Sequence, residues 1–492
     1  MRWPAAPGEE LETGTVMTLH PATGLLMLLT LALLVVTTGI PIWLSLIATA
    51  SIFSLIGCLL GFFDPAVLSA ASSRTLGLLE HDLLQALPLY VFVGCLMQRL
   101  QIADALYVTL ERMSRRTGAG DAIASFGIGA LVATKNGSVA SSTAMLARLI
   151  GPRLGPFHAA KATALICTAS TVGVVVPPSM VLLLLGDAML RAHREASNLP
   201  GYGLTGQRII NTHDVFQSAL LPATAITLLW LLVAWWQGRE QKVHPCSEPV
   251  GRLQWFVSAV FTLTVVALLM GVFAGRFFAV EASATLAVLL IAAALASRAL
   301  RWADWEETLH ETMNLSGSLF ALLVGATTFS LVFRLWGTGQ WIADAILSSS
   351  LSGTLTVALV LLLVALCAFV LDAFEMIFVI IPIVAPAMIV RLGDAQQTAV
   401  LLLLVLQLSF LVPPTGYAVM MARARSGLAR VSNLILFRSL FPYLVAQAAI
   451  TLAVFTTPWT VHLLDNEATR RVDQSVLSNE EVDRQMRAMS EP

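Results

Sequence analysis

Two adjacent prolines stand in the middle of an apolar run of membrane length, and this feature restricts the fold more than any other in the chain. Residues 174–186 read VVVPPSMVLLLLG. Proline lacks the backbone N–H and its ring clashes with the preceding helical turn, so a pair inside a helix is costly. The freed carbonyls find no water in hydrocarbon and must face protein or a hydrated cavity. We expect an interrupted helix around an internal site; the alternative is a kink that accommodates tilted packing.

The composition is that of a membrane protein. Of 492 residues, 57% are hydrophobic and only 12% are charged, whereas soluble domains carry about 25% charged residues. Apolar runs of about 18 residues or more recur along the chain and predict an all-α polytopic protein in a lipid bilayer. The net charge of −1 argues against nucleic acid as a partner. The five cysteines form no C-x-x-C pair, so we expect no disulfide framework, no zinc site and no cofactor.

We expect a set of full membrane spans and two segments of a different kind. The full spans are read near residues 22–38, 41–62, 83–100, 161–190, 215–236, 253–274, 280–297, 314–336, 397–422 and 438–459. Segments 121–151 and 353–390 are each long for one span and carry polar or small residues near the middle. That pattern favours re-entrant hairpins, with one irregular span followed by a loop as the alternative. Residues 1–20 are expected to be an N-terminal extension, 21–462 the membrane domain and 463–492 a polar tail.

Basic residues predict the orientation, because cytoplasmic loops carry an excess of Lys and Arg. The basic clusters are Arg112, Arg115 and Arg116, then Arg148, Arg153 and Lys161, and finally Arg423, Arg425, Arg430 and Arg438. All of them fall in the cytoplasm if both hairpins return to their own side. The N-terminus is then outside, the first hairpin opens from the cytoplasm and the second from the periplasm. The loop 191–214, with three arginines, fits this orientation less well.

The proline pair belongs to an internal repeat. VPPS at 176–179 recurs as VPPT at 412–415. Asn136 precedes Pro177 by 41 positions and Asp372 precedes Pro413 by the same 41, so both features repeat at an offset of 236. Since the two copies enter from opposite sides, they are inverted repeats. Such repeats place broken helices at the bilayer midplane, where half-helix N-termini attract anions and freed carbonyls bind cations. The sequence therefore predicts a secondary transporter with two hairpins and two unwound helices.

The candidate binding residues lie at the hairpin tips and the helix breaks. Hard cations such as sodium take oxygen ligands. The ion or substrate site is predicted from Lys135, Asn136, Gly137, Ser138, Ser142, Thr143, Pro178, Ser179, Asp372, Glu375, Pro414, Thr415 and Gly416. Sodium ligands are expected among Asn136, Ser138, Ser179, Asp372 and Thr415, with a proton as the alternative coupling ion. The density of serine and threonine also suits close helix packing, so by itself it is a weak signal.

The two acids and the lysine at the tips leave several roles open. Asp372 is an intramembrane carboxylate, which marks a functional site by default. Glu375 follows on the same helical face and either shares a proton with Asp372 or reaches a water-filled edge. Lys135 costs about 2.5–3.5 kcal/mol at mid-membrane. It neutralises a carboxylate substrate, pairs with Asp372 or Glu375, occupies the space of a cation, or snorkels to water.

Other polar residues are expected to be peripheral. Arg334, Asp187 and Glu281 sit near span ends and are interpreted as interfacial. The chain contains no H-E-x-x-H and no G-x-S-x-G motif. We therefore do not expect an enzyme.

At these residues the chain resembles the large membrane subunit of tripartite ATP-independent periplasmic (TRAP) transporters, the DctM-like permeases. The resemblance runs from about residue 24 to 459 and is closest to the mannitol/chloroaromatic or 2-oxo acid branch. It rests on LPLYVFVGCLMQR (87–99), VPPSMVLLLLGD (176–187), NTHDVFQSALLPA (211–223), LVGATTFSLVF (323–333), FVLDAFEMIFVIIPIVAP (369–386) and LQLSFLVPPTGYA (406–418). Together these stretches are specific, whereas any one alone is not.

The resemblance implies a bacterial inner-membrane permease that works as a sodium-driven elevator. It implies a small four-helix membrane subunit (DctQ-like), a periplasmic binding protein (DctP-like) and usually an organic acid as substrate. By motif position, the family's sites carry over to Asn136, Gly137, Ser138, Pro178, Ser179, Asp372, Pro414, Thr415 and Gly416. A transport domain with both hairpins would slide against a scaffold built mainly from spans such as 215–274 and 314–336. Lys135 departs from the small, uncharged tip of this branch, which leaves the identity and number of coupling ions open.

Two other functions compete with this interpretation. One is a dicarboxylate- or citrate-type symporter that works without a binding protein. The other is an ion channel, which would conduct without coupling to a gradient. The substrate itself is not predicted, because in this architecture the binding protein would select it.

Overall fold

The computed structural model describes residues 13–464 except 80–83, 85, 101, 115–119, 134–138, 152–158, 178, 201, 203–209, 239–250, 275, 368–370, 372, 413–415 and 426–430. All the regular elements in this part of the chain are helices. They are α1 (Thr13–Thr38), α2 (Ile42–Leu59), α3 (Pro65–Leu68), α4 (Ala70–Leu79), α6 (Leu87–Arg99), α7 (Ile102–Ser114), α8 (Gly120–Ile128), the π-helical η2 (Gly129–Ala133), α9 (Val139–Ile150), α10 (Ala159–Val175), α11 (Met180–Ala196), α12 (Thr212–Gly238), α13 (Arg252–Phe273), α14 (Ala279–Ser297), α15 (Trp302–Leu335), α16 (Thr338–Leu347), α17 (Gly353–Cys367), α18 (Ala373–Glu375), the π-helical η4 (Met376–Ile380), α19 (Ile381–Leu392), α20 (Ala395–Ser409), α21 (Tyr417–Arg425), α22 (Asn433–Thr456) and α23 (Trp459–His462).

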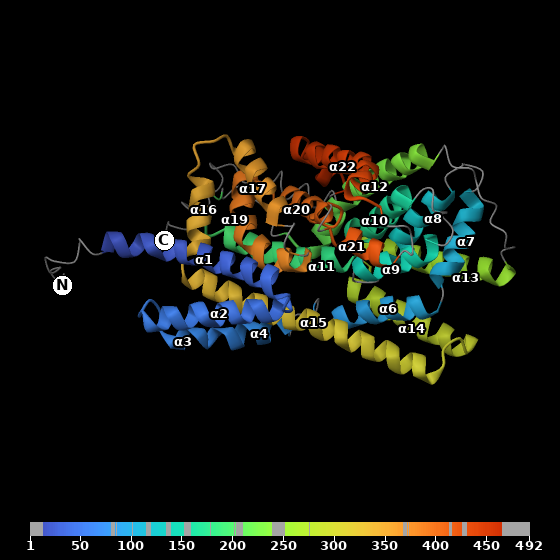
Figure 1. Ribbon diagram of the computed structural model, residues 1–492, viewed down its shortest axis with the longest axis horizontal. Coiled ribbons are helices and arrows are strands. Elements are labelled where there is room, and N and C mark those ends of the chain that lie inside the picture. Colours follow the sequence, from blue (N-terminus) through green and yellow to red (C-terminus); the bar gives the residue numbers. More distant parts are fainter. Residues whose placement is uncertain are drawn as a thin grey trace, which may run out of the picture.

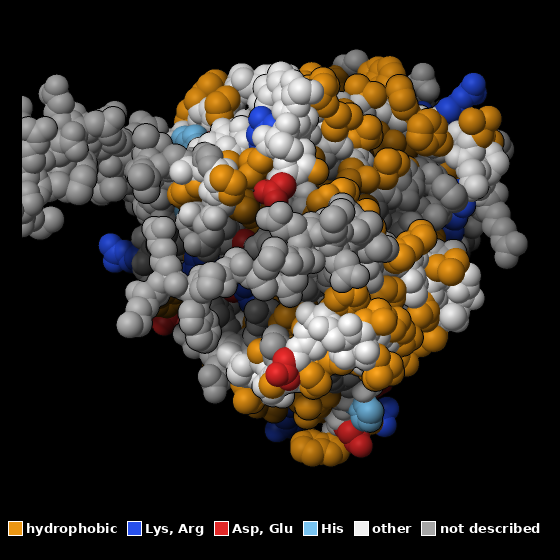
Figure 2. Space-filling view, turned by 90° about the vertical axis from the view of Figure 1, so that its left-hand side faces the viewer, with side chains coloured by type: hydrophobic (Ala, Val, Ile, Leu, Met, Phe, Trp, Pro, Cys, Tyr) orange, Lys and Arg blue, Asp and Glu red, His pale blue; other side chains and the backbone are white. Residues whose placement is uncertain are grey.

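The helices are those of a polytopic membrane protein, as the sequence predicts. Within the described residues, seven helices are long and apolar enough to cross a bilayer, and two bent pairs raise the number to nine. Large apolar side chains are exposed on the outside of the bundle, among them Leu55 at 62%, Leu263 at 72% and Leu363 at 56%. Figure 2 shows one end of the molecule, where apolar side chains cover much of the described surface and charged ones are few. The exposed leucines on the outside of the bundle suit lipid or a membrane partner.

The helices form two groups, one above the other in Figure 1. The lower group holds α2, α4, α6, α14 and α15, and α15 packs against α2 and α6 along its length. Gly325 allows α15 to approach α2 closely, because a Cβ there would lie 2.8 Å from the Trp43 carbonyl oxygen. The upper group holds the two hairpins, the two broken helices, α12 and α22.

The first predicted hairpin is confirmed by the contacts at its two ends. Its arms are α8 with η2 and α9, while residues 134–138 between them lie outside the described residues. The Tyr107 hydroxyl of α7 donates to Asp121 at the start of the first arm, 2.7 Å away. Asp104, also on α7, lies 3.8 Å from Arg148 near the end of the second arm. The segment therefore returns to the end from which it enters.

The second hairpin is confirmed in the same way. Its arms are α17 and the run α18, η4 and α19. A Cβ on Gly353, which begins the first arm, would lie 3.7 Å from the carbonyl oxygen of Arg391, which is near the end of the second arm. The Arg391 guanidinium also donates to the carbonyl of Ile346, near the end of α16, at 2.8 Å. Both ends of this hairpin therefore lie beside α16.

The long helix α15 shows that the two hairpins enter from opposite ends of the bundle. Near its start, Glu307 accepts from Arg99 of α6 at 2.7 Å, close to α7 at the base of the first hairpin. The helix ends at Leu335, just before α16 at the base of the second hairpin. The inverted arrangement expected from the basic residues is therefore present in the fold.

The two broken helices follow the predicted repeat. The pair α10 and α11 bends by 44°. Helices α10 and α20 begin at Ala159 and Ala395, which differ by 236 positions, the offset found in the sequence. The return arm of each hairpin packs against the second half of the other repeat's broken helix, α9 against α21 and α19 against α11. The two repeats are therefore interlocked rather than placed side by side.

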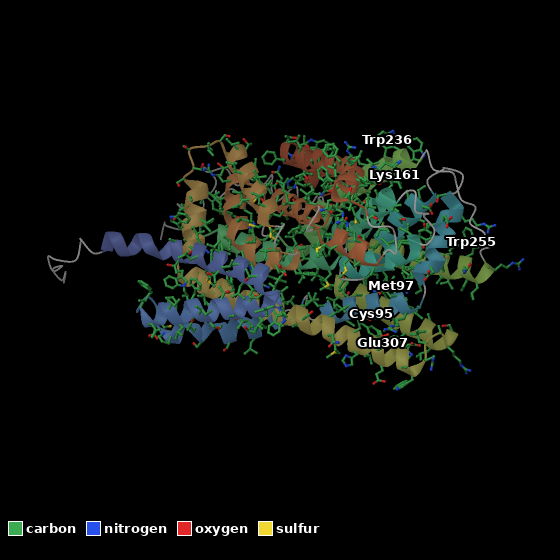
Figure 3. The ribbon with its side chains drawn as sticks, viewed as in Figure 1. Cys95, Met97, Lys161, Trp236, Trp255 and Glu307 are labelled. Atoms are coloured by element: carbon green, nitrogen blue, oxygen red, sulfur yellow. The ribbon has the colours of Figure 1, made fainter. Side chains whose placement is uncertain are left out.

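The ends of the helices sort into two sets. Lys161 at the start of α10 donates to the Gln237 carbonyl at the end of α12, at 3.0 Å. Figure 3 shows Lys161, Trp236 and Trp255 in the right-hand part of the molecule, with Glu307 below them. At the other end of α15, Arg334 pairs with Glu195 of α11 at 2.7 Å. The end that holds Lys161 and Gln237 is the one that the basic residues predict to be cytoplasmic, and the Arg334–Glu195 pair lies at the opposite end.

The loop that fitted the orientation less well begins later than predicted. The span read as 161–190 continues as α11 to Ala196, so Arg191 and Arg194 belong to the last turns of a helix rather than to a loop. Cations are favoured there by the helix dipole. Arg191 also pairs with Asp187 of the same helix. Arg191 and Arg194 are therefore stabilised by the helix dipole, and Arg191 also by the Asp187 carboxylate.

Several elements differ from the sequence prediction. The span read as 83–100 is α6, which turns by 67° into α7, a helix that was not predicted. The short helices α3, α4 and α16 were also missed, and α15 begins at Trp302 rather than 314. Helix α1 begins at Thr13, before the boundary expected at residue 21.

The expected scaffold also needs correction. Spans 215–274 are expected in the scaffold, but α12, which covers the first of them, packs against α10, α11, α20 and α22. Its buried Trp230 donates from the indole Nε1 to the Tyr443 carbonyl of α22 at 3.0 Å. Helix α12 therefore belongs with the repeats, because its apolar side chains are buried against these helices.

Candidate functional site

The described part of the predicted site consists of Ser142, Thr143, Ser179, Glu375 and Gly416. The other predicted residues lie outside the described residues: Lys135, Asn136, Gly137, Ser138, Pro178, Asp372, Pro414 and Thr415. Their assignment stays a prediction. The neighbouring described residues nevertheless show how the breaks and tips are held.

At the first break, Ser179 holds the two half-helices together. Its hydroxyl donates to the Val174 carbonyl of α10 at 2.8 Å and accepts from the Leu182 N–H of α11 at 3.1 Å. Ser179 is therefore the N-cap of α11 and satisfies one carbonyl that the break sets free. The side chain is 1% exposed. One lone pair of its oxygen stays free of these two contacts, which is the pair a cation ligand would need.

At the second break, Gly416 permits a tight backbone turn. Its N–H donates to the Val412 carbonyl at 2.8 Å, and the Ala418 N–H donates to the Phe410 carbonyl at 3.2 Å. A Cβ on Gly416 would lie 2.7 Å from the Phe410 oxygen and 2.8 Å from the Val412 oxygen. The turn therefore requires glycine, and it directs the N-terminus of α21 toward the break.

The first hairpin is tied to α10 through two buried contacts. The Thr143 hydroxyl donates to Ser170 Oγ at 2.8 Å. On the other arm, a Cβ on Gly129 would overlap the Ala169 carbonyl oxygen, so the backbone of η2 lies directly against α10. Ser142 and Thr143 are 1% and 0% exposed. The hydroxyl of Thr143 serves this helix contact, in line with the packing role that the sequence left open.

Glu375 lies at the end of α18, next to the undescribed tip residues of the second hairpin. Its side chain is buried, with 6% exposed. The π-helical segment η4 begins at the following residue, and π-helical turns are frequent at functional sites. A carboxyl this buried in a membrane segment must be paired or protonated.

The two repeats meet in a buried polar contact that the sequence analysis did not identify. Gln407 of α20 donates from Nε2 to the Thr171 carbonyl of α10 at 3.4 Å. Gln447 of α22 donates to Gln407 Oε1 at 3.0 Å and to the Leu404 carbonyl at 2.9 Å. Both glutamines are at most 1% exposed. The sequence does indicate this contact, because each glutamine stands inside an apolar run, LVLQLSF and LVAQAAI.

A cavity of about 700 Å³ lies where α11 meets α15. Its lining includes Asp187, Arg191, Glu195 and Arg334, together with Ile377 and Phe378 of the second hairpin. Asp187 is 2% exposed and pairs with Arg191. The interfacial interpretation of Asp187 is therefore wrong, because α11 continues well beyond the predicted span end. Glu281 accepts from the Phe278 N–H at 2.9 Å and caps α14.

This geometry defines a class of protein: a membrane transporter with inverted repeats, two hairpins and two broken helices. Residues 28–460 match the model of a protein family described as "Tripartite ATP-independent periplasmic transporter, DctM component". The match spans most of the chain, and the chain belongs to this family. It is therefore a permease component and not an enzyme, and it is a multi-pass protein of the bacterial inner membrane. The branch within the family stays a prediction.

Known relatives are similar at low identity over most of their length. The chain is 22% identical, over 404 residues, to the "C4-dicarboxylate TRAP transporter large permease protein DctM" of Pseudomonas aeruginosa, covering 80% of this chain and 89% of that protein. It is 20% identical, over 388 residues, to the "Isethionate TRAP transporter permease protein DctMQ" of Oleidesulfovibrio alaskensis, covering 76% of this chain and 57% of that protein.

A solved structure shares the fold. The YdaH transporter of Alcanivorax borkumensis superposes with a TM-score of 0.56 at 16% identity, covering 90% of this chain and 99% of that chain. The likeness extends over nearly the whole molecule, so the helix arrangement of this chain is one already seen in a membrane transporter.

Proposed function

We propose that this chain is the membrane subunit through which a small organic acid is imported by symport with sodium. The observation that carries the proposal is the pair of interlocked, oppositely oriented repeats. Each repeat supplies a hairpin and a broken helix, and the return arm of each hairpin packs against the second half of the other repeat's broken helix. Broken helices of this kind bind ions and substrates at the midplane in secondary transporters.

An elevator mechanism is favoured by how the helices group. Helices α11, α12, α19 and α20 pack against one another, and Figure 1 shows them together with α10 and α22. Helices α2, α6 and α15 form the second group. The first group would move as one body along the second and carry the hairpin tips from one side of the membrane to the other.

Sodium is the proposed coupling ion because the breaks offer oxygen ligands. The Ser179 hydroxyl and the Val174 carbonyl to which it donates lie at the first break, and the predicted carboxylate of Asp372 would add a charge. Each elementary charge that crosses the membrane contributes about 2.3 kcal/mol per 100 mV. Two sodium ions with a monoanion would therefore be driven by both the concentration gradient and the membrane potential. A proton is the alternative ion.

The substrate and partners follow from the family. A tripartite system supplies a periplasmic binding protein (DctP-like) and a small four-helix membrane subunit (DctQ-like) beside this chain. The name DctMQ of one relative supports a small subunit. The substrates in the two relatives' names, C4-dicarboxylate and isethionate, are organic anions. We propose a carboxylate, and a 2-oxo acid if the predicted branch is correct.

Uptake into proteoliposomes tests this proposal. The chain is reconstituted in vesicles together with the small subunit. The binding protein and radiolabelled organic acids are added to the outer solution, and uptake is measured with a sodium gradient across the membrane. We expect saturable uptake that needs both sodium and the binding protein. Uptake that persists when choline replaces sodium would contradict sodium as the coupling ion.

The same assay separates the alternatives. A binding-protein-independent symporter of the dicarboxylate or citrate type would transport at full rate without the binding protein. A channel would pass current that neither saturates nor depends on a gradient of a second ion. The matched control is the Asp372→Ala chain in the same vesicles, which should insert but not transport.

A further inference from the structure

The cavity between α11 and α15 has the size and chemistry of a ligand site. Its volume of about 700 Å³ falls within the usual range for small-molecule pockets. The second hairpin contributes an apolar wall of Ile377, Phe378 and Pro382. Helix α15, which packs against η4, also lines the cavity, and its Thr327 and Ser330 add hydroxyl groups. Such a mixture of apolar surface and a few polar groups is typical of pockets that orient a small ligand.

The charges around the cavity favour an anion. Among the described residues, three arginines line it, Arg191, Arg194 and Arg334, against two carboxylates, Asp187 and Glu195. Asp187 pairs with Arg191 and Glu195 pairs with Arg334. Arg194 forms no ion pair with any residue that the structure describes, and the described lining of the cavity carries a formal excess of one positive charge. Guanidinium groups bind carboxylates through two parallel hydrogen bonds.

The Glu195–Arg334 pair spans the seam between the two groups of helices. Glu195 belongs to α11, which packs against α19 and α12, whereas Arg334 belongs to α15, which packs against α2 and α6. Their side chains are 36% and 43% exposed, and the contact is 2.7 Å. Ion pairs this open to solvent contribute little to stability, so another anion can replace one partner.

Arg334 also has room to exchange partners. The pair lines a second cavity of about 30 Å³ that lies beside Gly339 and Ala343 of α16 and Pro386 of α19. Arg334 and Glu195 therefore both border two open spaces, and the Arg334 side chain is 43% exposed.

We propose that this cavity is a carboxylate-binding vestibule, in which Arg334 exchanges Glu195 for the carboxylate of the incoming organic acid. Arg194 supplies the excess charge that attracts the acid. Binding would break the ion pair across the seam, so loading of the substrate loosens the contact between α11 and α15. The inference rests on the proposed import function, and it assigns roles to residues outside the predicted hairpin-tip site.

A thiol-labelling experiment tests the vestibule without any need for transport. Ser330→Cys places a thiol in the cavity of the full-length chain in lipid nanodiscs, and labelling is measured as the increment over the parent chain with its own cysteines. Anionic 2-sulfonatoethyl methanethiosulfonate and its cationic trimethylammonium analogue are compared, each corrected for its reaction with a free thiol. We expect the anionic reagent to react faster. An equal rate, or a preference for the cation, would overturn the proposal.

Charge variants show whether Arg334 is shared. Arg334→Gln should lower the anion-to-cation ratio of labelling rates by about tenfold, because a unit charge roughly 6 Å away in water changes each rate about threefold and in opposite directions. Glu195→Gln should raise the ratio by a similar factor, and Arg334→Lys should leave it near the parent value. A purely structural ion pair predicts instead that both glutamine variants loosen the seam and speed both reagents alike, which would refute the exchange.

The matched control is the Arg99–Glu307 pair, which has the same 2.7 Å contact on the same helix α15 but lies outside the cavity. Glu307→Gln should not change the ratio. Millimolar succinate or pyruvate should slow the reaction of the anionic reagent with the Ser330→Cys variant, whereas succinamide should not; no slowing by either acid would remove the assignment to carboxylates. If uptake fails while labelling behaves as described, the import function is wrong and the anion site stands.

Discussion

Gln407 and Thr171 occupy the same position in the two repeats, 236 residues apart, and the Gln407 amide donates to the Thr171 carbonyl at 3.4 Å. Residues related by a two-fold axis touch each other only where they lie close to that axis. The contact therefore marks the place where the pseudo-two-fold axis of the inverted repeats passes between α10 and α20. Gln447 holds the Gln407 side chain in place from α22.

The first prediction concerns this contact. Gln407→Leu and Gln447→Leu should each lower the stability of the detergent-solubilised protein by about 1 kcal/mol, the scale of a hydrogen bond between membrane helices. Because the two side chains share one hydrogen bond, the double variant should lose less than the sum of the two losses. Thermal unfolding of all three variants checks this. Asn314→Leu, at an exposed position on α15, is the control and should change little; strictly additive losses would show that the glutamines act independently.

The second prediction concerns the turn at the second break. Gly416→Ala should abolish or strongly reduce uptake, because the new methyl group would collide with two backbone oxygens that shape the turn. Gly317→Ala is the matched control, since a Cβ there meets open space on α15. Helix propensity makes that control slightly more stable, by up to about 1 kcal/mol. Normal uptake by Gly416→Ala would mean that the turn does not position the site.

The third prediction separates capping from ion binding at Ser179. Ser179→Ala should destabilise the protein by about 1 kcal/mol through loss of the N-cap, and it should also raise the sodium concentration needed for half-maximal uptake. Ser432→Ala removes the equivalent N-cap of α22 far from the site, where Ser432 accepts from the Ile435 N–H at 3.4 Å. This control should lose stability without any change in sodium dependence. Identical sodium curves for both variants would leave Ser179 a cap only.

The fourth prediction concerns the predicted residues at the second tip and break. Asp372→Ala and Thr415→Ala should each abolish uptake, because they remove an acidic and a hydroxyl ligand of the proposed cation. Both proteins should still insert in the membrane, as measured by protease protection and by the amount recovered in the membrane fraction. Asp64→Ala and Thr456→Ala, at exposed positions, serve as controls. Near-normal uptake in the first two variants would remove the assignment of the site to the tips.

The sequence by itself determined the class of fold and the repeat. Long apolar runs predict membrane helices, and a proline pair in such a run predicts a break, because hydrocarbon offers no partner for a freed backbone carbonyl. These are local consequences of composition, so one chain is enough to read them. The duplicated offset of 236 positions then predicted inverted hairpins, and the contacts of Asp121, Arg148, Gly353 and Arg391 confirm both of them.

Only the tertiary structure decided which residues meet. The turn of α6 into α7, the place of α12 among the repeats and the hydrogen bond between Gln407 and Thr171 all depend on contacts between distant segments. The cavity lined by Asp187, Glu195 and Arg334 also depends on contacts between distant segments. From the sequence, an acid near a predicted span end is interpreted as interfacial, and only the packing of its helix shows that it lines a cavity. Pattern and propensity describe one segment at a time, whereas a binding site is formed by side chains that packing brings together.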